Sequence, residues 1–437
     1  YKGTYYLDAS IRRDKSSALP VANNTYYYPS VATTLILSNL IKKDWLSFGK
    51  FRANYAEVGN DTSPYQVFNT YNVGAAFNGS ASASNPSAFN NPNLKSETSK
   101  EFEVGLEAQF FNSRLGFDFS YYKRKTVDLI TPITVSNATG ASNLWLNGGD
   151  MENTGYEAVV NATPIKTSNF SWDVKVNWST NEGIITRLAE GIEFMQLASV
   201  GGGITLGGAL NEPFGTIRGK DLVYHANGQP IVKTNGYYQL TTATTAKIGN
   251  ITPDWTGGVK NTFKYKNFSL SALVDIQKGG DVFSLDTWYG YATGLYDFTA
   301  GTNELGNPVR NSNATGGGVI LPGVQANGTP NTVRAAANDY ANPWGYKRAA
   351  QSQHVYDASF VKLREVSLSY VFPKDLINKF SLENLSFSVI GRNLWIIHKN
   401  TPYSDPEAGL GSGNIQGYQS GAYPAVKEIG ASLKFEF

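Results

Sequence analysis

The sequence contains two stretches whose side chains have the chemistry to bind a ligand. In the first, "SDPEAG", the carboxylates of Asp405 and Glu407 flank Pro406. Two carboxylates at this spacing hold a cation or accept hydrogen bonds from a ligand hydroxyl. The simpler interpretation is a proline-fixed turn with hydrated charges, because Asp and Pro are common turn residues. Both interpretations stay open on the sequence.

The second stretch is rich in aromatic side chains. It comprises "DTWYGYATGLYDF" (286–298) together with "NPWGYKR" (342–348). Aromatic faces stack on sugar rings or peptide side chains and give a large contact area at little cost in entropy. The same rings would equally pack the loops together or face a partner protein. The six candidates are Trp288, Tyr289, Tyr291, Tyr296, Trp344 and Tyr346.

Composition excludes several other kinds of site. The chain has no Cys, so it holds neither a disulfide framework nor a Cys-based metal site. Its three histidines are far apart in sequence and indicate no metal cluster. We recognise no Ser-His-Asp or Cys-His arrangement, and we expect neither an enzyme nor a bound cofactor. The net charge of +2 argues against a nucleic-acid partner.

The candidate residues lie between segments of strictly alternating polarity. In "FSWDVKVNW", Phe170, Val174 and Trp178 belong to one apolar face, and Asp173 and Lys175 belong to a polar face. Such alternation indicates β-strands whose two faces meet different surroundings. Helical periodicity is nowhere sustained. The twelve predicted strands span 2–13, 26–40, 45–58, 98–111, 114–127, 151–164, 169–182, 254–265, 267–279, 356–372, 384–397 and 426–437.

These strands are much longer than the five or six residues usual in soluble proteins. The segment from Phe170 to Trp178 extends about 27 Å and, tilted by about 40°, spans about 20 Å of membrane height. Short and long connections alternate, as in transmembrane barrels with tight periplasmic turns and long extracellular loops. A β-sandwich or propeller would not need such length. The long connections are 59–97, 128–150, 183–253, 280–355 and 398–425.

The chain ends on an alternating strand, "IGASLKFEF", whose apolar face includes Phe435 and Phe437. A free terminus usually frays and carries polar residues. In a closed barrel the last strand pairs with the first, so no edge is left free. The ending also resembles the C-terminal β-signal of bacterial outer-membrane proteins. We therefore interpret Phe435 and Phe437 as an assembly signal and expect the apolar sets to face lipid.

Several segments resemble one family, the SusC/RagA group of TonB-dependent transporters. "NNPNLKSETSKEFEVGLE" (90–107) is similar to the family's "NPDLKWE" segment before a barrel strand. "YDASFVKLREVSLSYVFP" (356–373) is similar to its most recognisable C-terminal motif. "GRNLWIIHKNTPYSDPEAG" (391–409) and the segment 250–280 match others, as does the closing strand. Together they cover most of the chain from about residue 90 onward.

The resemblance implies a function and a set of partners. Members of the family have an N-terminal plug and a 22-stranded barrel, and act with a SusD-like surface lipoprotein. The chain would then be the C-terminal part of such a barrel, without the plug, in the outer membrane of a Bacteroidota bacterium. TonB, acting through the missing plug segment, would drive import of oligosaccharides or oligopeptides. One assembly that the resemblance allows is a dimer of transporter–lipoprotein pairs.

Alternatives stay open beside this interpretation. A small closed barrel of twelve strands is compatible with the even strand number. A plugless passive porin or a β-rich surface adhesin would need neither TonB nor a lipoprotein. Under the favoured hypothesis, loop 280–355 forms much of the partner contact and the mouth of the binding cavity, since exposed aromatic side chains are costly unless covered. The residues expected to line the lumen are Glu101, Glu103, Glu107, Asp118, Lys175 and Arg364.

Overall fold

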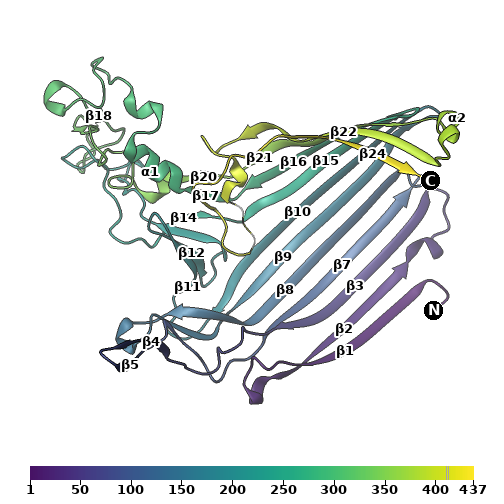
Figure 1. Cartoon of the computed structure of the whole chain (residues 1–437), viewed down its shortest axis with the longest axis horizontal. Helices are drawn as coiled ribbons and strands as arrows, with labels where there is room; N and C mark the ends of the chain where they lie inside the picture. The colour runs from purple at the N-terminus through teal and green to yellow at the C-terminus, as the bar shows by residue number, and fades with distance from the viewer. Residues whose placement is uncertain (410, 412) are drawn as a thin grey trace.

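A computed structural model describes residues 1–409, 411 and 413–437 of the chain. Most of the chain forms one sheet in which twelve long strands follow one another in sequence order and pair antiparallel (Figure 1). Two positions of the predicted connection 398–425, Leu410 and Ser412, lie outside the described residues. The strands are β1 (Tyr5–Lys15), β2 (Thr25–Ile36), β3 (Leu46–Asn60), β7 (Glu97–Phe110), β8 (Leu115–Thr134), β9 (Asn143–Lys166), β10 (Phe170–Leu188), β15 (Pro253–Tyr265), β16 (Phe268–Gly279), β21 (Phe360–Val371), β22 (Asn384–Lys399) and β24 (Glu428–Glu436).

The predicted fold class, an all-β up-and-down antiparallel sheet, is confirmed. The alternating sequence explains the register, because like side chains stand opposite one another on neighbouring strands. Leu433 of β24 faces Phe387 of β22, and Ser432 faces Ser388. A slip by one residue would move every apolar side chain to the other face of the sheet. The hydrophobic pattern therefore fixes the pairing as well as the strands.

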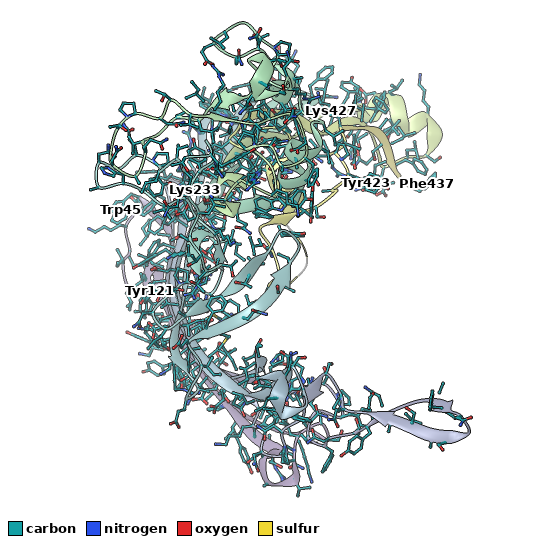
Figure 2. The ribbon with its side chains drawn as sticks, turned by 90° about the vertical axis from the view of Figure 1, so that its left-hand side faces the viewer. Trp45, Tyr121, Lys233, Tyr423, Lys427 and Phe437 are labelled. Carbon is teal, nitrogen blue, oxygen red and sulfur yellow. The ribbon has the colours of Figure 1, made fainter. Side chains whose placement is uncertain are left out.

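The sheet curves, and its two faces differ in chemistry. Figure 2 views it from the end that carries the loops and shows an open arc with Tyr121 on the convex side. The large apolar side chains of this face stay uncovered, and Leu368 is 49% exposed. The opposite face carries ion pairs, including Lys50–Glu107 at 2.6 Å. This arrangement is the reverse of a water-soluble protein and suits an apolar exterior with a wet interior.

The sheet does not close on itself within the described residues. β24 pairs only with β22, and β1 pairs only with β2, so both outer edges are open. The small closed barrel is therefore wrong for this chain, in which β24 and β1 do not pair with each other. The physical reason is curvature, because twelve strands complete only an arc (Figure 2).

One predicted loop is mostly strand. β8 continues to Thr134 and β9 begins at Asn143, so the connection predicted for 128–150 shrinks to 135–142. A bulge near Asp128, which has a φ of 57°, shifts the register between Thr126 and Leu129. Because an inserted residue interrupts the period of two, the sequence pattern ends before the strand does.

The other long connections are folded and cover one end of the sheet (Figure 1). The helix α1 (Leu285–Thr293) and a core of Ile204, Ile217, Phe283 and Trp288 belong to this loop layer. No helix of the described chain is long and apolar enough to cross a membrane. The remaining elements are β4 (Asn72–Phe77), β5 (Ser80–Ser84), β6 (Ala88–Phe89), β11 (Phe194–Val200), β12 (Ile204–Ala209), β13 (Thr216–Gly219), β14 (Ala246–Asn250), β17 (Asp281–Ser284), β18 (Val319–Ile320), β19 (Arg334–Ala335), β20 (Val355–Asp357), α2 (Lys374–Ile377) and β23 (Tyr418–Gln419).

We expect a new charge to lower the stability of the sheet much more on its convex face than on its polar face. Replacing Leu368 or Val174 with Arg should destabilise the barrel by about 2–4 kcal/mol near the middle of a bilayer, because the charge enters hydrocarbon. The same change at Ser367 or Lys175, on the polar face, should cost far less. Denaturant unfolding of the protein refolded in lipid vesicles measures both. Equal sensitivity of the two faces would show that the convex side does not face lipid.

The last residue offers a second test. Phe437 is 81% exposed, and its ring lies beside that of Phe435, with 5.6 Å between centroids. Removing it therefore sacrifices little packing, yet its deletion or change to Asp should lower assembly in the outer membrane if the terminus is an assembly signal. The matched control is Ile429→Ala, because Ile429 is equally exposed on the same strand. Normal outer-membrane levels of the truncated protein would contradict the hypothesis.

Candidate functional site

A cavity of about 310 Å³ lies in the loop layer, between α1, the turn 402–408 and the segment 419–425. It is the candidate site because segments far apart in the sequence bring aromatic rings and charges together there. Two larger hollows, of about 490 and 420 Å³, lie on the wall beside the predicted lumen residues Glu101, Glu103, Glu107, Asp118 and Lys175. The polar and aromatic lining of the loop cavity is Ser284, Asp286, Thr287, Tyr296, Tyr356, Lys399, Tyr403, Ser404, Asp405, Gln419 and Tyr423.

The helix α1 positions one side of the cavity. Its first turn is capped by Ser284, whose hydroxyl accepts a hydrogen bond from the Thr287 amide at 3.2 Å. It ends at Gly294, which has a φ of 72°. The carboxylate of Asp286 accepts a hydrogen bond from the Gly421 amide at 2.8 Å, which ties the segment 419–425 to the helix. This helix was not predicted from the sequence, because nine residues show too little periodicity.

Two of the eight predicted ligand contacts line the cavity, namely Tyr296 and Asp405. Trp288 is only 5% exposed and packs on Phe283, with 6.0 Å between ring centroids. The premise that the aromatic cluster is exposed is therefore wrong for Trp288, since this ring belongs to the core of the loop layer. Glu407 lies beside the cavity, in contact with β21.

The remaining predicted rings pack the loops against one another. Tyr291 meets Tyr296 edge-on at 5.0 Å and Phe298 at 4.7 Å, and Phe298 reaches Trp344 at 5.4 Å. Edge-to-face pairs of this kind add stability beyond the area they bury. A second group lies at the surface, where Tyr289 is 46% exposed and contacts Tyr346 at 5.2 Å.

The acidic turn is bound to the wall of the sheet. Lys362 of β21 donates a hydrogen bond to Asp405 Oδ1 at 2.6 Å and also pairs with Glu407. Arg364 donates to both oxygens of Glu407, at 2.9 and 2.8 Å. The interpretation as a hydrated turn is wrong, because the Asp405 side chain is 11% exposed. Among the described residues, no acidic and histidine side chains form a metal-binding group.

These ion pairs decide the ionisation of the turn. Burial raises the pKa of Glu407, but the hydrogen bonds from Arg364 and Lys362 lower it by a larger amount. The pKa of Glu407 therefore lies below its ordinary value. Glu407 is therefore ionised at neutral pH. Arg364 was predicted as a lumen residue and Lys362 was not, although both lie on the polar positions of "FVKLREVSLSY".

Comparison with known proteins identifies the family. The model of the family described as "TonB dependent receptor-like, beta-barrel" matches residues 1–389. The chain belongs to the TonB-dependent receptor family. Across the whole chain the receptor is 28% identical to TonB-dependent receptor P3 of Formosa agariphila, covering 44% of that protein. It is 24% identical to TonB-dependent receptor SusC of Bacteroides thetaiotaomicron, over 86% of this chain and 35% of SusC.

The fold comparison agrees. The structure of the RagAB peptide transporter matches with a TM-score of 0.76 and 21% identity, over 99% of this chain and 46% of that chain. The resemblance to the SusC/RagA group is confirmed. The receptor chain thus spans less than half the length of the relatives it matches.

A buried histidine of the receptor joins a cavity-lining side chain, Thr287, to the backbone of Trp344. His354, 1% exposed, lies between Thr287 Oγ1 and the Trp344 carbonyl, each 2.9 Å from a ring nitrogen. Because a carbonyl only accepts, Nε2 must carry the proton, and Nδ1 shares the single hydroxyl proton of Thr287 with the Ser284 carbonyl, which lies 3.1 Å from Oγ1. The Tyr356 hydroxyl donates to Thr287 at 3.3 Å, so a cavity-lining ring is connected to the histidine. Burial lowers the pKa of His354 to about 4.

The neutral histidine predicts a pH dependence of the loop layer. Unfolded His354 has a pKa near 6.5 and binds a proton that the folded state excludes down to about pH 4. The free energy of unfolding of the loop layer therefore has its full value above about pH 6.5. It falls by up to about 3 kcal/mol as the pH drops toward 4. Hydrogen exchange of α1, corrected for intrinsic rates, measures this loss.

The matched variants are His354→Gln, which should remove the dependence in this window, and His398→Gln, which alters an exposed histidine of β22 and should keep it. An α1 helix that stays equally protected at pH 7 and pH 4.5 in the unaltered receptor would contradict the assignment of a neutral, buried imidazole.

Proposed function

We propose that the receptor is part of a TonB-dependent importer that carries a nutrient across the bacterial outer membrane. The observation that supports this most strongly is the agreement of family and fold, since the family model matches residues 1–389 and the RagAB match covers 99% of the chain. The name of that structure describes a peptide transporter, and its likeness to this chain extends to the fold alone. The alternatives, a passive porin or a surface adhesin, have no comparable support.

The two faces of the sheet suit this role. The convex face, with uncovered side chains such as Leu270 and Leu368, is suited to lipid. The opposite face is polar, and Arg52 bridges Glu103 and Asp118 at 3.2 and 2.9 Å. Such a wall suits a water-filled lumen that receives a plug. We infer that the plug and the barrel strands that complete the arc belong to sequence outside this chain, and that TonB acts through that plug.

The loop cavity is the proposed capture site. Tyr296 and Tyr403 form an aromatic corner with 4.3 Å between ring centroids. Lys399, Asp405 and Gln419 supply polar groups on the other sides. Rings flanked by donors and acceptors suit either an oligosaccharide or an oligopeptide, and these are the two proposed substrate classes. In this proposal the loop end of the barrel lies outside the cell.

A separate aromatic surface suits the partner. Tyr289 and Tyr340 are 46% and 57% exposed, and both pack on Tyr346. The Lys347 ammonium lies 5.2 Å from the Tyr346 ring centroid. Exposed rings grouped in this way are typical of protein contacts. We propose that a SusD-like lipoprotein covers this surface, and that loop 280–355 thus serves the partner with one side and the substrate with the other.

The proposal predicts that cavity and partner surface respond differently. Replacing both Tyr296 and Tyr403 with Ala should weaken substrate capture about thirtyfold, if the corner contributes about 2 kcal/mol as a hot spot. Replacing Tyr289 with Ala should instead loosen the lipoprotein and leave the cavity intact. Uptake by the complete transporter, screened with single oligosaccharides and oligopeptides, measures the first effect. Co-purification of the lipoprotein measures the second.

Deletion of loop 280–355 gives a coarser test of the same proposal. Uptake should be abolished while the heat-resistant barrel remains, because the strands of the wall lie outside the deleted range. Ile204 and Ile217 would lose their partners Phe283 and Trp288 in this variant, so the point variants are the sharper comparison. Growth on the transported nutrient after the deletion would show that the loop has no part in capture.

A further inference from the structure

The wall of the barrel carries a buried cation that faces the loop layer. The Lys362 side chain is 4% exposed, although lysine is almost never fully buried unless it is paired. Its ammonium contacts Asp405 Oδ1 at 2.6 Å and the Glu407 carboxylate. Burying a charge is costly without such partners. The lysine therefore depends on the acidic turn, and the turn depends on the lysine.

The neighbouring cation is aimed by a backbone irregularity. Along β16, Leu273 faces Glu365 and Val274 faces Leu363, so Arg364 is the extra residue of a β-bulge. Bulges re-aim side chains and are frequent beside functional sites. Here Arg364 holds Glu407 with two hydrogen bonds, at 2.9 and 2.8 Å, and Asp275 of β16 with another at 3.0 Å. We call Lys362, Arg364, Asp275, Asp405 and Glu407 the ionic clamp.

The clamp fixes a turn that forms one side of the cavity. Asp405 Oδ1 also accepts the Glu407 amide at 2.9 Å, and the Asp405 carbonyl accepts the Ala408 amide at 2.9 Å. Tyr403, Ser404, Asp405 and Ala408 of this turn line the cavity. The Tyr403 ring lies against Tyr296 at 4.3 Å between centroids. Neither Lys362 nor Arg364 is among the residues that line the cavity.

We propose that Lys362 and Arg364 are positioning residues: they hold the turn 402–408 against the wall and thereby set the distance between Tyr403 and Tyr296 across the cavity. They act through Asp405 and Glu407 and do not touch the captured molecule. The geometric part of this inference stands independently of transport, and its consequence for capture rests on the function proposed above.

Hydrogen exchange of the complete transporter in detergent tests the geometric part. In Lys362→Met, which keeps an unbranched side chain one atom shorter and removes its charge, the Glu407 and Ala408 amides should exchange at least about tenfold faster. The helix α1 and the strand β21 should keep their protection. Lys362→Arg should restore slow exchange. The matched control is Lys260→Met, an exposed lysine of β15 for which slow exchange should persist.

Two outcomes overturn the inference. The first is that the turn remains protected from exchange in Lys362→Met. The second is that α1 and β21 lose protection together with the turn, as general unfolding would produce. If Lys362→Met fails to assemble, Glu407→Gln applies the same test from the loop side, with Glu365→Gln as its control on the wall. The wall pair Glu365–Arg392, at 3.1 Å, lies outside the clamp.

The consequence for capture is measured with the single oligosaccharide or oligopeptide that the uptake screen selects. Lys362→Met should raise its half-saturating concentration at least about tenfold with an unchanged maximal rate, because a displaced wall weakens binding only. An unchanged half-saturating concentration, with the turn released, overturns the role in capture. A screen in which the unaltered transporter takes up no compound contradicts the proposed function, and hydrogen exchange then still decides whether the clamp positions the turn.

Discussion

Backbone pairing between neighbouring strands is the constraint on which the rest of the receptor depends. In hydrocarbon no water replaces a missing partner, so each strand must satisfy its amides and carbonyls on its neighbours. The alternating sequence then assigns one face to each surrounding. Leu368 stays uncovered at 49% exposure, which would be a liability in water, while Arg52 on the other face is paired with Glu103 and Asp118. A sheet built in this way leaves little freedom for a binding site on its own strands.

The site is therefore built in the loop layer, and the wall supplies its support. Several charges of the polar face pair with one another within the sheet, such as Lys50 with Glu107. Lys362 and Arg364 differ, because they reach out of the sheet to the turn 402–408. Breaking one partner of a buried ion pair is strongly destabilising, whereas exposed pairs contribute little. Rigid strands thus locate a loop that is otherwise held by its own packing and by the hydrogen bond from Lys399 of β22 to the Ser404 carbonyl, at 2.8 Å.

How much of this could be predicted follows from the range of each interaction. The strands and their faces were predictable because period-two alternation is local, but a bulge at Asp128 obscured one end, and the 3-10 turn Leu37–Asn39 stopped the strand predicted for 26–40 at Ile36. The helix α1 was not predicted, since its cap at Ser284 is one hydrogen bond within a Gly-rich loop. Tyr296 and Asp405 were named as candidates, but their convergence on one cavity was not predicted. Lys362 was missed because its partners lie more than forty residues along the chain.

One turn makes contact with both the wall and the cavity. Asp405 and Glu407 face the cations of β21, while Tyr403 extends to Tyr296 beside the helix. The wall contact depends on charge, and the cavity contact depends on aromatic area. Because these forces act on different residues, the rings of the cavity can differ without loss of the contact that holds the turn. The helix and the segment 419–425 are joined separately, through Asp286 and Gly421. The lining can therefore vary while its attachment to the barrel persists, which is what a fold serving many substrates requires.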